Sequence, residues 1–367
     1  MNGKALWSRR VWERRDSIGS LLWFLALPAS LSYSLAVGAR NLLYNGGCLP
    51  TKRLPRAVVS VGNITVGGTG KTPTSAWLAQ ELAHRGYRVA ILTRGYRRAK
   101  RNTVILEPDT AGVYPASKRE IDAVGDEAWM MAKLFGHKVA VGRSRYEAGS
   151  RLLEATEVDI FILDDGFQHR QLRRDVDLVL LGEDDGGWML PAGPFREPKS
   201  AIGRADLILV TSAKEKWEGV LEERRRRSVV FFASPQPECL RSWENGRWHE
   251  RPLSVLAGTK VLAVCGIAKP DFFYRMISDW QAEIVEVVEF EDHHAYSQKD
   301  WQRINRSARK AELIVTTEKD IIKLMHFPFA KGRLLGLRVA MAIERGNALV
   351  DAVERLVRDR TGGHRVG

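Results

Sequence analysis

Short apolar runs alternate with amphipathic stretches along most of this chain. The apolar runs predict buried strands at residues 58–61, 88–92, 138–141, 159–163, 176–181 and 206–211. Helical periodicity covers residues 74–85, 126–135 and 144–155, and Gly86 and Gly136 stand where the first two helices should end. Strands that alternate with helices are typical of parallel βαβ units. The pattern therefore predicts an α/β protein with a doubly wound parallel sheet, whose ligands bind beyond the carboxyl ends of the strands.

The alternation breaks between residues 213 and 252. A charge run at residues 221–227 precedes a short strand at 229–232 and a loop, Ser234-Pro235-Gln236-Pro237. A second α/β unit begins at 261–265, continues through 284–290 and 313–317, and ends in a helix near 347–359. We therefore expect an N-terminal helical segment at 1–50, a first domain at 51–220, an interdomain connection at 221–252 and a smaller α/β domain at 253–367.

The N-terminal region is unusually apolar. Residues 17–39 carry no charged side chain, and this length is enough to cross a bilayer. Basic residues flank the segment on both sides: Lys4, Arg9, Arg10, Arg14 and Arg15 before it, and Arg40, Lys52, Arg53 and Arg56 after it. Such flanks define no inside–outside asymmetry. We expect a membrane-associated helix or helical hairpin that lies on an anionic leaflet, with a spanning helix, a cleaved signal peptide and a buried core helix as alternatives.

The composition of the chain indicates which kinds of molecule it could bind. The chain of 367 residues has a formal net charge of +13, which favours an anionic partner such as nucleic acid, an anionic membrane or a phosphate-bearing substrate. A basic protein that is merely soluble would have the same composition. Cys48, Cys239 and Cys265 lie far apart in the sequence. Their spacing argues against a disulfide framework or a zinc site and fits a reducing compartment.

A glycine-rich motif, Gly67-Gly68-Thr69-Gly70-Lys71-Thr72, follows the first predicted strand and opens the first predicted helix. Backbone N–H groups at such a helix terminus face the phosphates of a nucleotide. Lys71 would reach the outer phosphates and Thr72 would ligate Mg²⁺. The generic pattern has glycine where this chain has Thr65, but the strand and helix context fits. The sheet is therefore expected to be of the P-loop NTPase type and to bind a nucleoside triphosphate.

Carboxylates occur at two further positions on the expected ligand side. Asp164 and Asp165 end an apolar strand, where an aspartate can hold Mg²⁺ beside a phosphate loop. Asp126 and Glu127 open a helix, and acidic residues there commonly serve only the helix dipole. The alternative is a general base and a metal ligand, since a hydroxyl nucleophile needs a proton acceptor during phosphoryl transfer.

Histidines and arginines supply the remaining candidates. His293 and His294 follow a strand, where both could be surface residues or one could tune a catalytic carboxylate. Arginines follow three strands or loops and suit phosphate recognition, although any one of them could be only solvated. These arginines are Arg94, Arg97 and Arg98, then Arg143 and Arg145, and finally Arg196 beside Glu197.

One stretch near the end of the second α/β unit partly matches a guanine-binding motif. The stretch Thr316-Thr317-Glu318-Lys319-Asp320 invites comparison with Asn/Thr-Lys-x-Asp, but Lys319 is adjacent to Asp320. The comparison fails, so ATP is the expected nucleotide and a GTPase switch is disfavoured.

Taken in order, these motifs resemble the tetraacyldisaccharide 4'-kinase family. The resemblance runs from the N-terminal segment to about Asp320 and depends on the order of five motifs: residues 61–73, Arg94-Gly95-Tyr96, Gly125-Asp126-Glu127, Asp164-Asp165-Gly166-Phe167-Gln168-His169 and Asp292-His293-His294. It implies ATP- and Mg²⁺-dependent phosphorylation of the 4'-hydroxyl of a tetraacyl glucosamine disaccharide 1-phosphate, giving lipid IVA in lipid A biosynthesis. It also implies a monotopic enzyme on the cytoplasmic face of the inner membrane.

The same resemblance implies roles for individual residues. The expected ATP-binding residues are Thr65, Val66, Gly67, Gly68, Thr69, Gly70, Lys71 and Thr72. The expected catalytic residues are Lys71, Asp126 as general base, and His293 or His294 as its tuning partner. The expected metal ligands are Thr72, Glu127, Asp164 and Asp165. The expected substrate- or phosphate-binding residues are Arg143, Arg145, Arg196 and Glu197.

Two other classes of protein compete with a lipid kinase. A membrane-bound partitioning or assembly ATPase often has lysine two residues before Gly68, where this chain has Val66. A nucleic-acid-dependent ATPase would explain the positive charge, but the chain lacks a basic strand motif rich in aromatic residues. We therefore expect a lipid substrate and an anionic membrane surface as partners, with no nucleic acid and no obligate protein partner.

Overall fold

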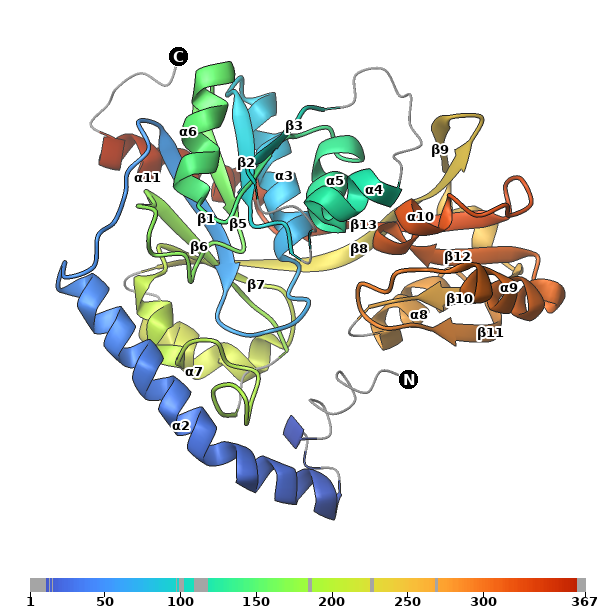
Figure 1. The fold of residues 1–367 in the computed structure, drawn as a ribbon, viewed down its shortest axis with the longest axis horizontal. Helices are drawn as coiled ribbons and strands as arrows, with labels where there is room; N and C mark the ends of the chain where they lie inside the picture. Colours follow the sequence, from blue (N-terminus) through green and yellow to red (C-terminus); the bar gives the residue numbers. More distant parts are fainter. Residues whose placement is uncertain are drawn as a thin grey trace.

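The computed structural model describes residues 11–12, 14, 16–96, 98, 102–108, 118–183, 187–224, 228–267 and 270–361 (Figure 1). Several residues named above lie outside these ranges: Lys4, Arg9, Arg10 and Arg15 before the apolar segment, Arg97, and the end of the charge run at residues 225–227.

The first half of the chain forms the predicted doubly wound parallel sheet. Its parallel strands are β1 (Ala57–Asn63), β2 (Val89–Thr93), β4 (Lys138–Val141), β5 (Ile160–Asp164), β6 (Val176–Leu181) and β7 (Leu207–Val210), in the spatial order β7-β6-β1-β5-β2-β4. A short strand that the sequence did not predict, β3 (Val104–Leu106), pairs antiparallel with β4 at the edge. Each parallel strand is buried on both faces, which explains its continuous apolar run.

Helices cover both faces of this sheet. The helices of this half are α3 (Lys71–His84), α4 (Lys118–Val124), α5 (Asp126–Lys133), α6 (Arg145–Ala155), the 3-10 helix η1 (Lys199–Arg204) and α7 (Lys214–Arg224). Helices α3 and α5 share one apolar core with the side chains of Val59 and Val61. Helix α6 packs on the opposite face against Val58 and Phe161. Helices therefore exclude solvent from both faces of the central strands, so a ligand can bind only at the carboxyl ends of the strands.

The second half adds a smaller group of strands and helices, as expected. Its strands are β8 (Val229–Glu244), β9 (Arg247–Arg251), β10 (Lys260–Cys265), β11 (Glu283–Glu289), β12 (Leu313–Thr317) and β13 (Leu334–Ile343). Its helices are η2 (Leu253–Leu256), α8 (Pro270–Ser278), α9 (Gln298–Ser307), η3 (Ala308–Lys310), α10 (Glu318–Leu324) and α11 (Gly346–Thr361). Strands β10, β11, β12 and β13 are parallel neighbours in the order β11-β10-β12-β13.

The prediction of a loop at residues 234–237 is wrong, because these residues lie within strand β8. It pairs parallel with β7 through Val229–Phe232 and antiparallel with β13 from Ala233 onward, so it joins both halves into one hydrogen-bonded sheet. Pro235 and Pro237 lie inside it, opposite Met341 and Val339. Along this stretch the described pairings involve β13 alone, so the other edge needs no N–H donors and tolerates proline. The domain boundaries themselves stay predictions.

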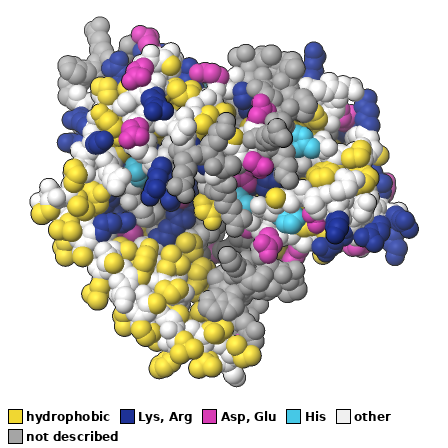
Figure 2. Space-filling view, in the orientation of Figure 1, with side chains coloured by type: hydrophobic (Ala, Val, Ile, Leu, Met, Phe, Trp, Pro, Cys, Tyr) yellow, Lys and Arg dark blue, Asp and Glu magenta, His cyan; other side chains and the backbone are white. Residues whose placement is uncertain are grey.

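Helix α2 (Ser17–Asn45) is one continuous helix, so the alternative of a helical hairpin is wrong. It is long and apolar enough to cross a membrane by length and composition, a test that core helices and signal sequences also pass. It lies along the edge of the first half, and Figure 2 shows hydrophobic side chains gathered over it. The exposed apolar side chains on α2 are Ile18, Leu21, Phe24, Leu25, Leu31, Leu35, Leu42 and Leu43. Its inner face buries Ser30 and Val37 against the protein.

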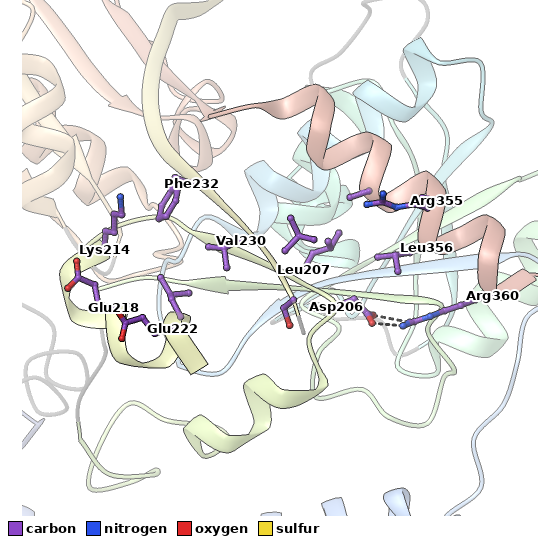
Figure 3. A pocket seen from close by; sticks show the side chains of 14 residues that line it. Asp206, Leu207, Lys214, Glu218, Glu222, Val230, Phe232, Arg355, Leu356 and Arg360 are labelled. Atoms are coloured by element: carbon purple, nitrogen blue, oxygen red, sulfur yellow. Dashed lines mark hydrogen bonds and ion pairs between the residues drawn. The ribbon is translucent and has the colours of Figure 1, made fainter. Parts of the chain in front are cut away.

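Helix α11 crosses back onto the first half. It contacts α3, β1 and β6, and Arg85, which caps the end of α3, donates to Asp351 and, over 3.0 Å, to Glu354. Between α11 and α7 lies a cavity of about 700 Å³, walled by side chains such as Lys214 and Arg355 (Figure 3). This cavity is at the amino ends of β7 and β8, opposite the edge where ligands of parallel sheets bind. The active site is therefore expected at the carboxyl ends of the strands.

Candidate active site

The glycine-rich motif forms a turn between β1 and α3. Gly67 and Gly70 adopt φ values of +117° and +81°, which side chains with a Cβ rarely adopt, and Gly70 is the residue that caps α3. Inside the turn, the amide of Asn63 donates to the hydroxyl of Thr69 over 2.9 Å. Backbone N–H groups at the start of α3 therefore face the carboxyl edge of the sheet, as phosphate binding requires.

Lys71 and Thr72 open α3, as the motif predicts. The Lys71 side chain is only 12% exposed, and its Nζ lies 3.4 Å from the Gly67 carbonyl and 3.8 Å from Asp165. Burial lowers the pKa of Lys71, and the nearby Arg196 lowers it further. Thr72, the second residue of α3, is buried. The Lys71 ammonium is held by weak, replaceable contacts at the point where phosphates would arrive.

Asp164 and Asp165 lie at the end of β5, next to the phosphate loop. Parallel pairing sets Asp164 opposite Val61 of β1, and the hydroxyl of Ser75 donates to Asp164 over 2.8 Å. Burial, followed by the charges of Glu127 and Asp165, raises the pKa of Asp164 to about 7. A buried carboxyl that is crowded by like charges would be relieved by a cation.

Asp165 is held differently from its neighbour. Its φ is +50°, and its two oxygens accept from Nη1 of Arg196 at 3.0 and 2.9 Å. Burial would raise the pKa of Asp165, but the charges of Lys71 and Arg196 outweigh it and lower that pKa. Asp165 is therefore ionised beside Lys71, and Arg196 fixes its orientation.

Asp126 begins α5 and meets side chains from the second half of the chain. Gly125 before it has φ +92°, and a Cβ there would lie 2.9 Å from the Tyr96 carbonyl. Oδ2 of Asp126 lies 2.8 Å from Nδ1 of His293 and 3.0 Å from Nζ of Lys323. Burial opposes ionisation, but the hydrogen bond from His293 and the charge of Lys323 prevail and hold the pKa of Asp126 well below its usual range.

Glu127 forms an ion pair with Lys319, at the start of α10. Burial would lower the pKa of Lys319, yet the charge and hydrogen bond of Glu127 raise it. Lys319 and Lys323 were not predicted as site residues. Lys319 stands in the stretch that failed as a guanine motif, and its proximity to the carboxylates depends on α10 packing against α5. No local signal in the sequence could have revealed that contact.

The two adjacent histidines separate in the structure. His293 has φ +59°, which turns its ring toward Asp126 and 5.3 Å from the ring of Tyr96. The ring of His294 stacks on Phe290 at 4.8 Å, and its Nε2 lies 3.1 Å from the carboxylate of Asp300. Of the pair, His293 is therefore the one that contacts the predicted base.

The predicted substrate-binding residues occupy different environments. Arg145 is buried and close enough to Arg94 and Asp165 to feel their charges; burial, followed by Arg94, lowers its pKa to about 10. Arg143 is exposed and accepts from Arg145 through its carbonyl. Glu197 has no exposed surface and accepts from both terminal nitrogens of Arg204 at 2.9 and 3.1 Å. Its role as a substrate ligand stays a prediction.

A family model described as tetraacyldisaccharide-1-P 4'-kinase matches residues 21–358. The chain belongs to the tetraacyldisaccharide 4'-kinase family. It is 38% identical to the tetraacyldisaccharide 4'-kinase of Syntrophus aciditrophicus over 339 residues, 86% of this chain and 88% of that one. The corresponding figures for the kinase of Aquifex aeolicus are 34% identity, 90% and 98%. The crystal structure of LpxK from Aquifex aeolicus in complex with ATP superposes with a TM-score of 0.75 at 33% identity, covering 92% of this chain and 99% of that one.

Membership of the tetraacyldisaccharide 4'-kinase family makes the chain a phosphotransferase of lipid A biosynthesis that uses ATP. The expected activity and the P-loop-type α/β fold are thereby confirmed. The family assignment excludes the alternative of a non-enzymatic partitioning ATPase.

The donors of this kinase fit Mg²⁺ bound together with a nucleotide. Among the described residues, no group of three or more His, Cys, Asp or Glu forms a ready-made metal cage. Mg²⁺ in kinases needs no such cage, because substrate phosphates and water complete its shell around one or two carboxylates. The crowded, buried Asp164, which is bonded to Ser75 of α3 and close enough to Lys71 to feel its charge, supplies that chemistry.

Proposed function

We propose that this kinase transfers the γ-phosphate of ATP to the 4'-hydroxyl of the tetraacyl disaccharide 1-phosphate, giving lipid IVA, with Mg²⁺ as cofactor and Asp126 as the proton acceptor. The observation that carries the proposal is the contact of Asp126 with His293 and Lys323, on the helix that also bears Glu127. Glu127 is close enough to Lys71 and Asp164 to act on the pKa of each. An ionised proton acceptor thus stands beside the predicted phosphate site.

Asp126 would accept the proton of the sugar hydroxyl. Its low pKa keeps it ionised, and His293 orients the carboxylate through Nδ1. A group with a low pKa is a weak base, so we infer that Asp126 acts together with His293 instead of alone. Phosphoryl transfer requires little covalent participation from the protein, so this positioning and the removal of one proton suffice.

Lys71 would neutralise charge on the outer phosphates. The contacts of its ammonium with Gly67 and Asp165 are long, so a phosphate can replace them. Thr72, Glu127, Asp164 and Asp165 are the proposed holders of Mg²⁺. When bound, Mg²⁺ would offset part of the negative charge of the phosphates. Arg143 and Arg145 would bind anionic groups of the substrate, with Arg196 acting through Asp165.

We propose further that the enzyme is monotopic at the cytoplasmic face of the inner membrane. Helix α2 is about 43 Å long at 1.5 Å per residue, longer than the ~30 Å hydrocarbon core of a bilayer. Contacts from Ser30 to Asn41 tie one side of α2 to the protein, while Leu21 and Leu35 point outward. A helix that lies in the interface accounts for both faces.

Anionic lipids are the proposed surface partner, and several of the flanking cations also make contacts within the protein. Arg40 lies 3.5 Å from Glu197, and Arg56 donates to the Val158 carbonyl. Lys52 lies over the ring of Tyr146. We propose neither nucleic acid nor an obligate protein as a partner.

The test of the activity is transfer of labelled γ-phosphate from ATP to the tetraacyl disaccharide 1-phosphate in detergent micelles. We expect labelled lipid in the presence of Mg²⁺ and none after chelation with EDTA. Folded enzyme that binds ATP and Mg²⁺ but yields no labelled lipid would refute the proposal.

The membrane arrangement has its own test. Replacing outward residues of α2, as in Leu21→Ser with Leu35→Ser, should reduce sedimentation with vesicles of phosphatidylglycerol and phosphatidylethanolamine. Activity on substrate in micelles should remain, because neither side chain contacts the protein core. Unchanged vesicle binding would contradict an interfacial α2.

A further inference from the structure

One loop connects the membrane-associated helix to the phosphate site. Residues 189–197, called here the 189–197 loop, lie between α2 and the segment that leads from β1 into the glycine-rich turn. The loop carries Arg196, the residue that orients Asp165. Any group that fixes this loop therefore influences the surroundings of Lys71.

Helix α2 fixes the loop from one side. The hydroxyl of Ser30 donates to the Met189 carbonyl over 2.6 Å, and both groups are buried. The hydroxyl of Tyr33 donates to the Arg196 carbonyl over 3.1 Å. These bonds come from the inner face of the helix, the face turned away from the exposed leucines.

A third contact reaches the end of the loop. The amide of Asn41 donates to Oε2 of Glu197 over 2.8 Å. Because Glu197 has no exposed surface, each donor to its carboxylate matters more than it would in water. Arg204 satisfies the same carboxylate from the core side, so Glu197 joins α2 to the body of the enzyme.

The segment that leads from β1 into the glycine-rich turn holds the 189–197 loop from the other side. The N–H of Val66 donates to the Pro194 carbonyl, and the N–H of Arg196 donates to the Ile64 carbonyl, each over 2.8 Å. Arg196 is thus bonded at its carbonyl by Tyr33, at its N–H by Ile64 and at its side chain by Asp165. A displacement of α2 would be transmitted through a single residue to Asp165.

We propose that the inner face of α2 is part of the nucleotide site, with Tyr33 and Asn41 acting as positioning residues that set Arg196 and the approach to the phosphate loop. This inference rests on the proposed function, because it assumes that the loop binds ATP. It assigns α2 a role that is separate from attachment to the membrane. Tyr33 and Asn41 touch no reacting group and act only through the 189–197 loop.

The test compares the two faces of α2 in detergent micelles, where no bilayer is present. The inner-face variants are Tyr33→Phe, which removes one hydroxyl, and Asn41→Asp, which replaces the amide donor by a carboxylate that repels Glu197. The matched outer-face variants are Leu35→Ser and Leu42→Ser, at positions that are 75% and 72% exposed. The measurements are KM for ATP, KM for the lipid, kcat, and the affinity for a non-hydrolysable ATP analogue.

Tyr33→Phe should raise KM for ATP and weaken analogue binding by about three- to ten-fold, the change expected from one lost hydrogen bond. Asn41→Asp should have at least as large an effect, because the new carboxylate repels Glu197. KM for the lipid should change less. Hydrogen exchange should be faster at the amides of Val66 and Arg196 in the inner-face variants. The outer-face variants should keep the ATP binding and the exchange rates of the wild type.

Folded Tyr33→Phe and Asn41→Asp proteins with wild-type ATP affinity and unchanged exchange at Val66 would overturn the inference. If Asn41→Asp fails to fold, Tyr33→Phe carries the test, since it deletes a single oxygen. A wild-type enzyme that binds ATP but never phosphorylates lipid would refute the proposed function and leave this inference to be decided by analogue binding.

Discussion

Asp126→Asn removes the negative charge at the start of α5 with almost no change of shape. An amide oxygen can still accept from Nδ1 of His293, so the position of the ring should be kept. The amide cannot take up the proton of a sugar hydroxyl. Removing a positioned general base costs about 10²–10⁴-fold in rate. We therefore expect kcat to fall by that factor, or about 3–5 kcal/mol of transition-state stabilisation.

The same substitution has a structural cost that must be separated from the chemical one. Lys323 has a 14% exposed side chain and its ammonium lies 3.0 Å from Asp126, so the asparagine would leave a largely buried charge without its partner. Breaking a buried ion pair from one side costs up to about 3–5 kcal/mol of folding stability. Replacing Lys323 by methionine as well should recover most of this stability, because methionine needs no counter-charge.

The assay is transfer of labelled γ-phosphate in micelles, combined with thermal unfolding of each protein. Asp126→Asn should lose both turnover and melting temperature, while Asp126→Asn with Lys323→Met should regain the melting temperature but not the turnover. ATP-analogue binding should change little in either protein. If the double variant recovered turnover together with stability, Asp126 would be a structural residue and the assignment of the base would be wrong.

Three further predictions concern the two histidines, Lys71 and Asp164. His293→Ala should lower kcat at least tenfold, since it removes the partner of Asp126, whereas His294→Ala should lower the melting temperature and spare kcat per folded molecule; equal losses of kcat would contradict the separation of the two rings. Lys71→Met should weaken ATP binding at least tenfold by calorimetry, and unaltered affinity would show that the ammonium does not meet the phosphates. The folded-state pKa of Asp164, about 7, lies above its unfolded value, so the native state binds the extra proton and loses stability as pH rises from about 4 to about 7. The melting temperature of the metal-free enzyme should therefore fall between pH 5 and pH 8, and Asp164→Asn should reduce that fall; an identical fall in the variant would refute the protonation.

The first half of the fold could be predicted from the sequence because its strands are parallel and covered on both faces. Such strands are continuous apolar runs, and glycines mark the ends of the intervening helices. Strand β8 could not be predicted in the same way, since Pro235 and Pro237 are typical of loops. Their place in a strand depends on the absence of a second neighbour at that point of the sheet, which only the assembled fold determines.

The candidate site likewise contains residues that local motifs predicted and residues that only the tertiary packing brings into it. Lys71, Asp126 and Asp164 were predicted because each follows a strand or opens a helix within a local motif. Lys319 and Lys323 escaped prediction because they reach Glu127 and Asp126 from far along the chain, through the packing of α10 on α5. The sequence left His293 and His294 as equal candidates, and the left-handed backbone at His293 is what separates their directions.

In the proposed arrangement, the cations from the second half also explain how two carboxylates can lie near the triphosphate site. Asp126 and Glu127 both carry charge at the start of α5, where they would repel the phosphates of ATP as well as each other. His293 and Lys323 hold Asp126, and Lys319 holds Glu127, so the positive end of each pair comes from a different part of the chain from the phosphate loop. The first half alone would therefore keep the loop but present uncompensated negative charge to the nucleotide. The proposed mechanism therefore depends on the second half, which neutralises this charge while leaving Asp126 ionised.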